Sequence, residues 1–199
     1  FENATCIAQS PTDANRFAVS TGRTGIYLYH KGTPEKQYTR GNSPLVSAVK
    51  NNSAASYSYV RTDGVIYDKA GNLFMLNNSA DTAIWALRPD GTWKGLYVKE
   101  LDNAPTLEKT MIDADGRLWV TSRRTVSNHN GGFLCLDYNG TLDNTEDDVS
   151  RYRTTFLNQD GSPCSFSQGL CFAQDRDGAI WLGTNEGIFK IEDPKTWFD

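Results

Sequence analysis

The stretch that decides the fold is Asp175-Arg-Asp-Gly178-Ala-Ile-Trp181-Leu182, which the chain contains in three versions. The other two copies are Asp113-Ala-Asp-Gly116-Arg-Leu-Trp119-Val120 and Asp68-Lys-Ala-Gly71-Asn-Leu-Phe74-Met75. In each copy an Asp starts a turn, a Gly allows the positive φ that closes it, and an aromatic residue follows among aliphatic ones. Each copy therefore predicts a hairpin turn that leads into a buried strand. Burial is expected for both Trp119 and Trp181.

Further strand patterns flank each copy. A partner strand precedes the turn at 64–67, 110–112 and 169–172, and a third strand follows at 84–87, 132–136 and 187–191. A fainter copy at 13–19 has its third strand at 25–29, and exposed fourth strands are indicated at 93–98 and around 152–156. Four antiparallel strands per repeat, without amphipathic helical stretches, are typical of a propeller blade.

The spacing of the copies supports the same interpretation. Gly71 and Gly116 are 45 residues apart, a usual blade length, whereas Gly116 and Gly178 are 62 apart. The excess falls in loops, so we predict an all-β β-propeller of about four four-stranded antiparallel blades, at about 1–45, 46–105, 106–160 and 161–199. Strong repeats up to the last residues, and a start at Phe1 without a signal peptide, lead us to expect a fragment of a larger propeller. Its open blade edges predict a possible dimer. A β-sandwich with coincidental Asp-Gly turns is the alternative.

Charge and cysteine content exclude several functions. With 20 basic and 24 acidic residues the net charge is −4, and no basic stripe indicates nucleic-acid binding. No apolar run has the length of a membrane span. The four cysteines lack metal-binding spacing. Cys135 is expected to be buried, while Cys164 and Cys171 either form a disulfide or remain free thiols.

Long polar loops are predicted on one face of the disc, at 39–58, 77–83, 99–109 and 122–131. Because binding residues gather on such loops, this face is the expected binding surface. The richest cluster consists of Arg123, Arg124, Asn128 and His129, which could hold a carboxylate, a phosphate or a sugar. The alternative is a merely solvated loop. Asn77-Asn78 and Asn185-Glu186 are weaker candidates.

Catalytic motifs are not recognisable in the sequence. The two histidines, His30 and His129, belong to no recognisable catalytic triad or metal-binding motif. The paired Asp residues of the repeats lack the spacing of a calcium-binding loop, and we interpret them as turn formers. We therefore expect a protein that is not an enzyme and has no metal or other cofactor.

The repeat resembles that of the two-component regulator propeller family, Asp-x-x-Gly-x-Ile-Trp-Ile-Gly-Thr followed by Gly-Leu. The stretch 175–189 matches it fully, 113–122 matches its first half, and 68–76 is a degenerate copy. The resemblance implies a non-enzymatic module in the periplasm or at the cell surface of a Gram-negative bacterium, with a glycan or a protein as its partner. Such repeats occur in the sensor part of hybrid two-component kinases and in PorZ-type proteins of the type IX secretion system. The residue patterns at 41–45, 84–93 and 158–161 are closer to those of the PorZ-type proteins.

An enzyme class shares part of the pattern. Streptogramin-type lyases resemble the stretch 84–93, and they require a metal ion and a catalytic histidine. His129 is the candidate for that histidine if its loop bends inward.

Overall fold

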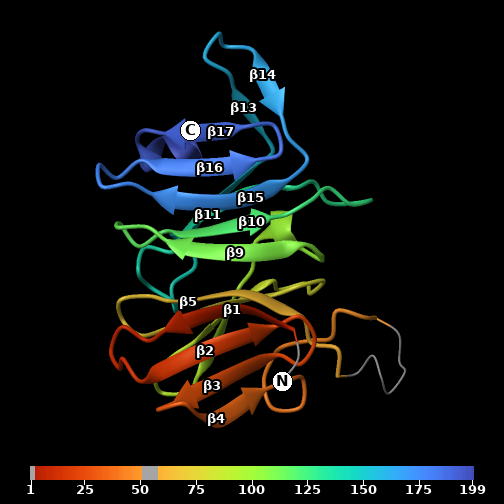
Figure 1. Cartoon of the computed structure of the whole chain (residues 1–199), viewed down its shortest axis with the longest axis vertical. Coiled ribbons are helices and arrows are strands. Elements are labelled where there is room, and N and C mark those ends of the chain that lie inside the picture. Colours follow the sequence, from red (N-terminus) through yellow and green to blue (C-terminus); the bar gives the residue numbers. More distant parts are fainter. Residues whose placement is uncertain (1–2, 51–57) are drawn as a thin grey trace. The chain divides into compact units, whose positions relative to one another are not determined.

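The computed structural model describes residues 3–50 and 58–199, in which antiparallel strands predominate (Figure 1). The chain forms two compact units, Phe1–Leu107 and Glu108–Asp199. The part of the predicted 39–58 loop at 51–57 lies outside the described residues.

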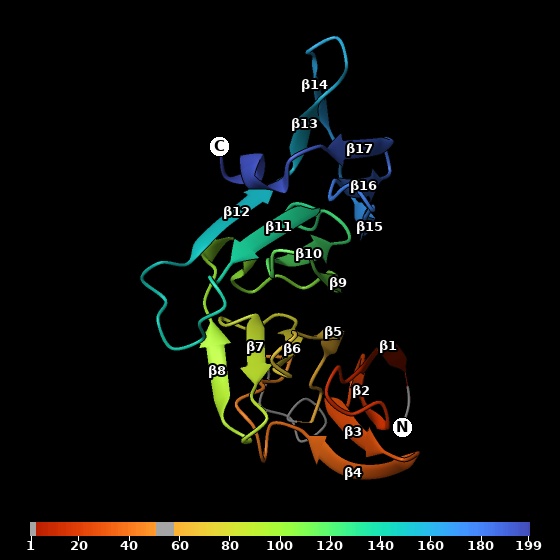
Figure 2. The ribbon, with the colours of Figure 1, turned by 90° about the vertical axis from the view of Figure 1, so that its left-hand side faces the viewer.

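Unit 1 contains two four-stranded sheets, each in the order of the sequence. The first has strands β1 (Ala4–Gln9), β2 (Arg16–Thr21), β3 (Ile26–His30) and β4 (Thr33–Tyr38). The second has β5 (Thr62–Tyr67), β6 (Leu73–Asn77), β7 (Ile84–Leu87) and β8 (Trp93–Leu96), with the short 3-10 helix η1 (Lys99–Leu101) after it (Figure 2). The sheets share a core in which Ile26 and Leu28 join Leu73 and Met75.

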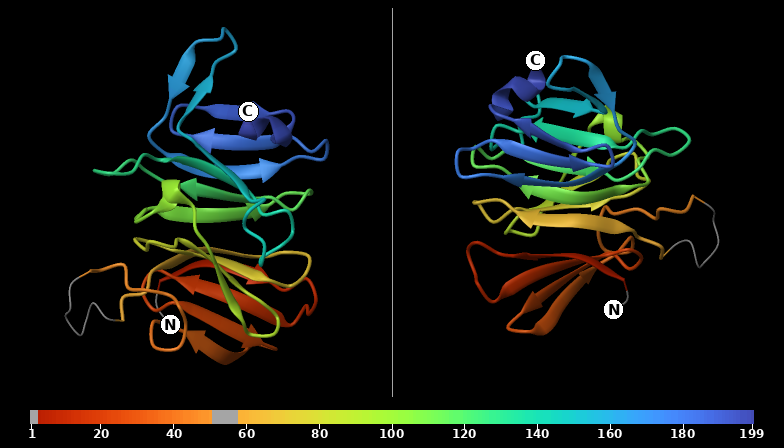
Figure 3. Two further views of the ribbon diagram at one scale, coloured as in Figure 1. Left: turned by 180° about the vertical axis from the view of Figure 1, so that it is seen from behind. Right: turned by 45° about the horizontal axis from the view of Figure 1, so that its top comes forward.

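Unit 2 contains a four-stranded sheet, a three-stranded sheet and a separate hairpin. The four-stranded sheet consists of β9 (Leu107–Ile112), β10 (Leu118–Ser122), β11 (Gly132–Asp137) and β12 (Val149–Arg153). The other sheet has β15 (Gly169–Gln174), β16 (Ile180–Thr184) and β17 (Ile188–Ile191). The hairpin β13 (Thr155–Leu157) and β14 (Pro163–Ser165) projects from these sheets, and the 3-10 helix η2 (Pro194–Phe198) follows β17 (Figure 3).

The sequential strand order of the four larger sheets confirms the predicted all-β, propeller-type fold. The predicted strands are all present. The hairpin β13–β14 and the helices η1 and η2 were not predicted. In the described residues, no helix is long and apolar enough to cross a membrane.

The turns of the repeats are built as the sequence predicts. Asp113 Oδ1 accepts hydrogen bonds from the backbone N–H groups of Asp115 and Arg117 at 3.1 and 2.9 Å. Gly116 closes the turn with a φ of 96°. Asp113 Oδ2 also accepts a hydrogen bond from the indole Nε1 of Trp119 at 2.9 Å, so one carboxylate ties the turn to the strand after it.

The other two copies share this plan with one difference. Asp175 Oδ1 accepts from the N–H groups of Asp177 and Ala179, and its Oδ2 accepts from Trp181 Nε1 at 2.8 Å. In the degenerate copy, Phe74 has no indole, and Asp68 Oδ2 instead accepts from Asn72 Nδ2 at 2.7 Å. The interpretation of these aspartates as turn formers is confirmed.

The expected burial of the two tryptophans is only half right. Trp119 is fully buried and packs edge-on against Trp197 of η2, with ring centroids 5.0 Å apart. Trp181 is 42% exposed, so its predicted burial is wrong. The Lys190 ammonium lies 5.3 Å from its ring centroid, and the indole lines an open cavity beside Lys190 and Ile188 instead of packing against another sheet.

The cysteines are free thiols. Cys135 on β11 is fully buried, as predicted, while Cys164 on β14 is half-buried and Cys171 on β15 is exposed. Burial raises the pKa of the Cys135 thiol, and the nearby Asp113 carboxylate raises it further. Cys135 is therefore a packing residue rather than a nucleophile.

Candidate functional site

Three long loops of unit 1 are fastened together by Asn77 and Asn78 at the end of β6. Asn77 Oδ1 accepts from the Val46 N–H at 2.7 Å, and its Nδ2 donates to the Val46 carbonyl at 3.1 Å. Asn78 Oδ1 accepts from the Leu107 N–H at 2.8 Å, and its Nδ2 donates to Asp63 Oδ2 at 2.7 Å. Both asparagines are fully buried. Their amide groups thus hydrogen-bond to neighbouring loops and strands, so these two weaker candidates support the loops rather than face a ligand.

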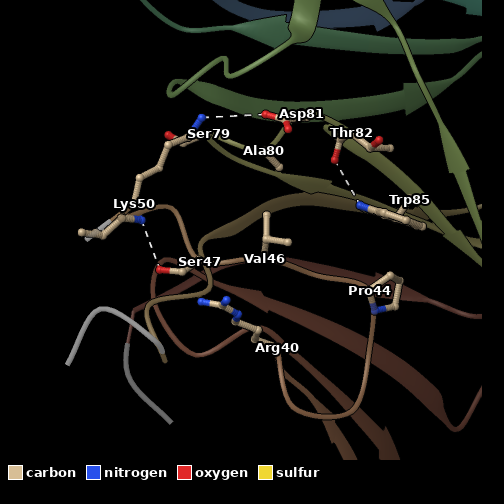
Figure 4. A pocket seen from close by; sticks show the side chains of 11 residues that line it. Arg40, Pro44, Val46, Ser47, Lys50, Ser79, Ala80, Asp81, Thr82 and Trp85 are labelled. Atoms are coloured by element: carbon tan, nitrogen blue, oxygen red, sulfur yellow. Dashed lines mark hydrogen bonds and ion pairs between the residues drawn. The ribbon is translucent and has the colours of Figure 1, made fainter. Parts of the chain in front are cut away.

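Two of these loops line a cavity of about 490 Å³, which we call the loop pocket (Figure 4). It is lined by residues of the segment after β4 and of the β6–β7 loop, together with the first part of β7. The lining side chains include Arg40, Pro44, Val46, Lys50, Ser79, Asp81, Thr82 and Trp85. The sequence analysis predicted the loops but none of these individual residues.

Trp85 provides the aromatic wall of the loop pocket. Its indole Nε1 donates to the Thr82 carbonyl at 3.1 Å, which fixes the ring orientation. Trp85 pairs across the strands with Gly95 on β8, and a Cβ at Gly95 would lie 3.0 Å from the indole. The glycine therefore gives the ring room to lie against β8.

Charged groups lie on the other side of the same cavity. Figure 4 shows Arg40 and Lys50 across from Trp85. Lys50 Nζ lies 3.8 Å from Asp81 Oδ1, and their side chains are 68% and 82% exposed. Lys50 also donates to Asn103 Oδ1. Exposed ion pairs contribute little stability, so a ligand could replace these contacts at small cost.

The lining of the loop pocket has the chemistry of a binding site. It combines a fixed aromatic ring with two cations, one carboxylate and three hydroxyl groups, a set that can orient a polar ligand carrying negative charge. Among residues 3–50 and 58–199, no group of three or more His, Cys, Asp or Glu is arranged to hold a metal ion.

The predicted cluster at Arg123, Arg124, Asn128 and His129 lies in unit 2, in the loop between β10 and β11. Arg123 Nε lies 2.8 Å from Glu108 Oε1, at an angle that makes the contact an ion pair rather than a hydrogen bond. His129 Nδ1 lies 3.3 Å from Ser122 Oγ, and its ring is 5.4 Å from that of Tyr152. Arg124 and Asn128 are exposed. Arg123 and His129 thus have separate partners, and ligand binding by the four stays a prediction.

The same loop is firmly attached to its surroundings. The Thr125 N–H donates to the Ser167 carbonyl at 2.8 Å, and a Cβ at Gly131 would lie 2.2 Å from that carbonyl. The Tyr152 hydroxyl donates to the Asn130 carbonyl, and burial raises the Tyr152 pKa, so the phenol remains a neutral donor. The loop is a braced hairpin rather than a free polar segment.

Comparison with known families defines the class of the repeat. The model of the two-component regulator propeller family matches residues 161–186, so the chain carries this propeller repeat, as the resemblance implied. Comparison of the sequence with curated proteins gives no match.

Solved structures with the same fold include surface and extracellular propellers. PorZ, described as an essential surface component of the type IX secretion system of Porphyromonas gingivalis, matches 94% of this chain with a TM-score of 0.84 and 24% identity. The extracellular domain of BT4673 from B. thetaiotaomicron, described as a one component system in one structure and as a hybrid two component system in another, matches 96% of this chain in the first, with a TM-score of 0.57 and 20% identity. A virginiamycin B lyase from Staphylococcus aureus matches 96% with a TM-score of 0.51 and 13% identity.

These matches establish the propeller-type fold and no more. The chain spans about a quarter of the PorZ chain, 24%, and 22% of the BT4673 domain. The activities and partners of those whole proteins are therefore not transferred with the fold.

Proposed function

We propose that the chain is a non-enzymatic binding module of an extracytoplasmic β-propeller, with the loop pocket as its ligand site. The observation that carries this proposal is the convergence of Trp85, Arg40 and Lys50 on one cavity in loops that buried asparagines hold in place. The TM-score of 0.84 with PorZ, a surface component of a secretion system, supports a location in the periplasm or at the cell surface of a Gram-negative bacterium.

The ligand class proposed for the loop pocket is a glycan with an acidic substituent. The flat indole of Trp85 offers apolar contact area to a sugar ring. Arg40 and Lys50 supply the cations for a carboxylate, sulfate or phosphate, and Asp81 can accept hydrogen bonds from sugar hydroxyls.

An array of acidic and neutral glycans tests this proposal. The intact chain should bind acidic glycans, and the double variant Arg40→Met/Lys50→Met should lose most of that binding because the long apolar stems remain while the charges are removed. Arg23→Met, at an exposed arginine outside the pocket lining, is the matched control. Binding of no acidic glycan, or equal binding by the double variant, would contradict the proposal.

A second candidate function is the sensor part of a hybrid histidine kinase, supported by the match with the BT4673 extracellular domain, which one structure describes as part of a hybrid two component system. The two roles differ in what the whole gene encodes. A membrane span followed by a kinase domain would favour the sensor, and a short β-domain without a span would favour the secretion component.

A metal-dependent lyase is the third candidate, and the fold match with virginiamycin B lyase is its support. It would use His129, which here contacts Ser122 and Tyr152. Metal-dependent cleavage of a streptogramin that disappears in His129→Ala would establish it.

Pairing of two chains through open strand edges also stays a prediction, and light scattering that shows a monomer at high concentration would count against it.

A further inference from the structure

The two sheets of unit 1 pack on each other through opposite faces of one repeat. Ala18 and Leu28, which are paired on β2 and β3, belong to the core shared with the second sheet. Leu73 and Met75 of β6 reach the same core from the other side. We call the face of a sheet that packs on the next sheet along the chain its trailing face, and the opposite face its leading face. The junction in unit 1 therefore joins a trailing face to a leading face.

Unit 2 is built on the same plan. Trp119 and Cys135 are paired on β10 and β11, and both lie on the trailing face of their sheet. Ile180 and Leu182 of β16 meet them from the leading face of the β15–β17 sheet. All four side chains are fully buried. Both units thus bury a trailing face against a leading face.

The trailing face of the β15–β17 sheet is open to solvent. Trp181 pairs with Lys190, and Gly183 pairs with Ile188. Because side chains alternate along a strand, these four positions lie on the side opposite to Leu182 and face away from the core. Ile188 is 74% exposed and Trp181 is 42% exposed. Both line an open cavity of about 910 Å³.

A comparison of two isoleucines shows what this face lacks. Ile188 and Ile26 each begin the third strand of their sheet, opposite Gly183 and Ser20 of the second strand. Ile26 is fully buried in the core shared with the next sheet, whereas Ile188 is left in water. An exposed apolar face is typical of an interaction site, and the repeat indicates that its partner is a leading face.

A leading face of the required kind lies at the surface of the first sheet. Phe17 and Val19 of β2 stand at the register positions that Leu73 and Met75 occupy on β6. Ile7 on the neighbouring strand β1 is 64% exposed. The residues that share this face along β1–β4 carry no charge, so an apolar partner can cover it without burying an ion. The face holds a hollow of about 310 Å³ that is lined by Ile7, Phe17, Val19, Tyr29 and Gly32.

We infer that the trailing face of the β15–β17 sheet docks on the leading face of the β1–β4 sheet in a second copy of this chain. A second copy is the occupant because each chain carries an exposed face of either kind, and the contact repeats the pairing of faces inside both units. Lys190 brings its own counterion, since its ammonium lies 2.9 Å from the Glu192 carboxylate. The contact is head-to-tail and uses sheet faces, so it differs from pairing through strand edges.

Sedimentation velocity of the intact chain between about 1 and about 200 µM tests this inference. We expect species larger than one chain, whose share rises with concentration. A head-to-tail contact closes into a dimer or continues into a longer array, depending on the rotation between copies, and either is heavier than one chain. Ile7→Glu and Ile188→Glu should each weaken association by about tenfold or more, because each places a charge in the apolar contact. Both residues are mostly exposed, so the variants should stay folded.

A mixture of the two variants separates head-to-tail docking from symmetric contacts. The Ile7→Glu chain keeps an unaltered trailing face, and the Ile188→Glu chain keeps an unaltered leading face. The mixture should therefore form one unaltered contact and regain association. Tyr97→Glu is the matched control, because Tyr97 is 61% exposed and follows β8, outside both faces, and it should associate as the unmodified chain does.

The methyl resonances of Ile7 and Ile188 give a measurement that needs no variant. In the unmodified chain, both should shift as the concentration rises. A monomer at every concentration would overturn the inference. So would association that both variants retain, which would point to the strand edges, or a mixture that associates no better than either variant alone.

Discussion

Two copies of one turn in unit 2 have the same local geometry and different surroundings. In both, an Asp carboxylate accepts backbone N–H groups and an indole Nε1, at 2.9 Å for Trp119 and 2.8 Å for Trp181. Yet Trp119 is fully buried, while Trp181 is 42% exposed. The short repeat motif determines the turn and its hydrogen bonds, but the elements that pack on the strand determine how far the tryptophan ring is buried.

Truncation of the two rings should separate these contributions most strongly. Trp119→Ala should lower the free energy of unfolding by about 3–5 kcal/mol, because it leaves a cavity beside Trp197. Trp181→Ala should cost about 1 kcal/mol, since its ring is partly in water already. Urea denaturation of both variants measures the difference, and equal losses would contradict the assignment of burial.

Removing the charge of the turn aspartate should also cost more stability at Asp113 than at Asp175. Asp113→Asn should lower the free energy of unfolding by about 3 kcal/mol, because the buried Arg117 guanidinium loses the buried carboxylate 2.7 Å from its Nε and keeps the exposed carboxylate of Asp115. Asp175→Asn has no such buried partner and should cost less. Urea midpoints of the two variants provide the test, and a larger loss at Asp175 would show that the local turn, not the ion pair, dominates.

The glycines should respond alike, which sharpens the comparison. Gly116 and Gly178 have φ values of 96° and 93°, and a Cβ at either would meet no atom within 4 Å. Substitution by Val should therefore cost about 1–2 kcal/mol at both sites, from backbone strain alone. A markedly larger loss at Gly116 in thermal unfolding would mean that packing also acts on the turn.

The smallest expected effect concerns pH. The hydrogen bond from Trp181 holds the pKa of Asp175 below its ordinary value of 3.8. The carboxylate therefore contributes stability that is fully present above its unfolded pKa and is lost as the pH falls through the lower native pKa. Asp175→Asn should reduce the difference in urea midpoint between about pH 6 and about pH 3. An unchanged difference would remove Asp175 from the acid response.

The features predicted from the sequence are those that short segments determine. The Asp–Gly turns, the alternating strands and the burial of Cys135 follow from turn chemistry and local pattern. The exposure of Trp181 and the packing of Trp197 on Trp119 depend on segments far apart in the chain. The loop pocket was not predicted for the same reason. The sequence suggests that Asn77 is a polar loop residue, because its hydrogen bond with Val46, 31 residues away in the chain, forms only in the folded structure.

The binding function of the loop pocket is tested most directly at Trp85. Trp85→Ala in the intact chain should weaken the affinity for the strongest acidic glycan of the array by about tenfold or more, with calorimetry as the measurement. The melting temperature should fall but the variant should remain folded, because the ring is half-buried against the core of unit 1 and the strand pairing to Gly95 remains. An unchanged affinity in a folded Trp85→Ala variant would contradict the account.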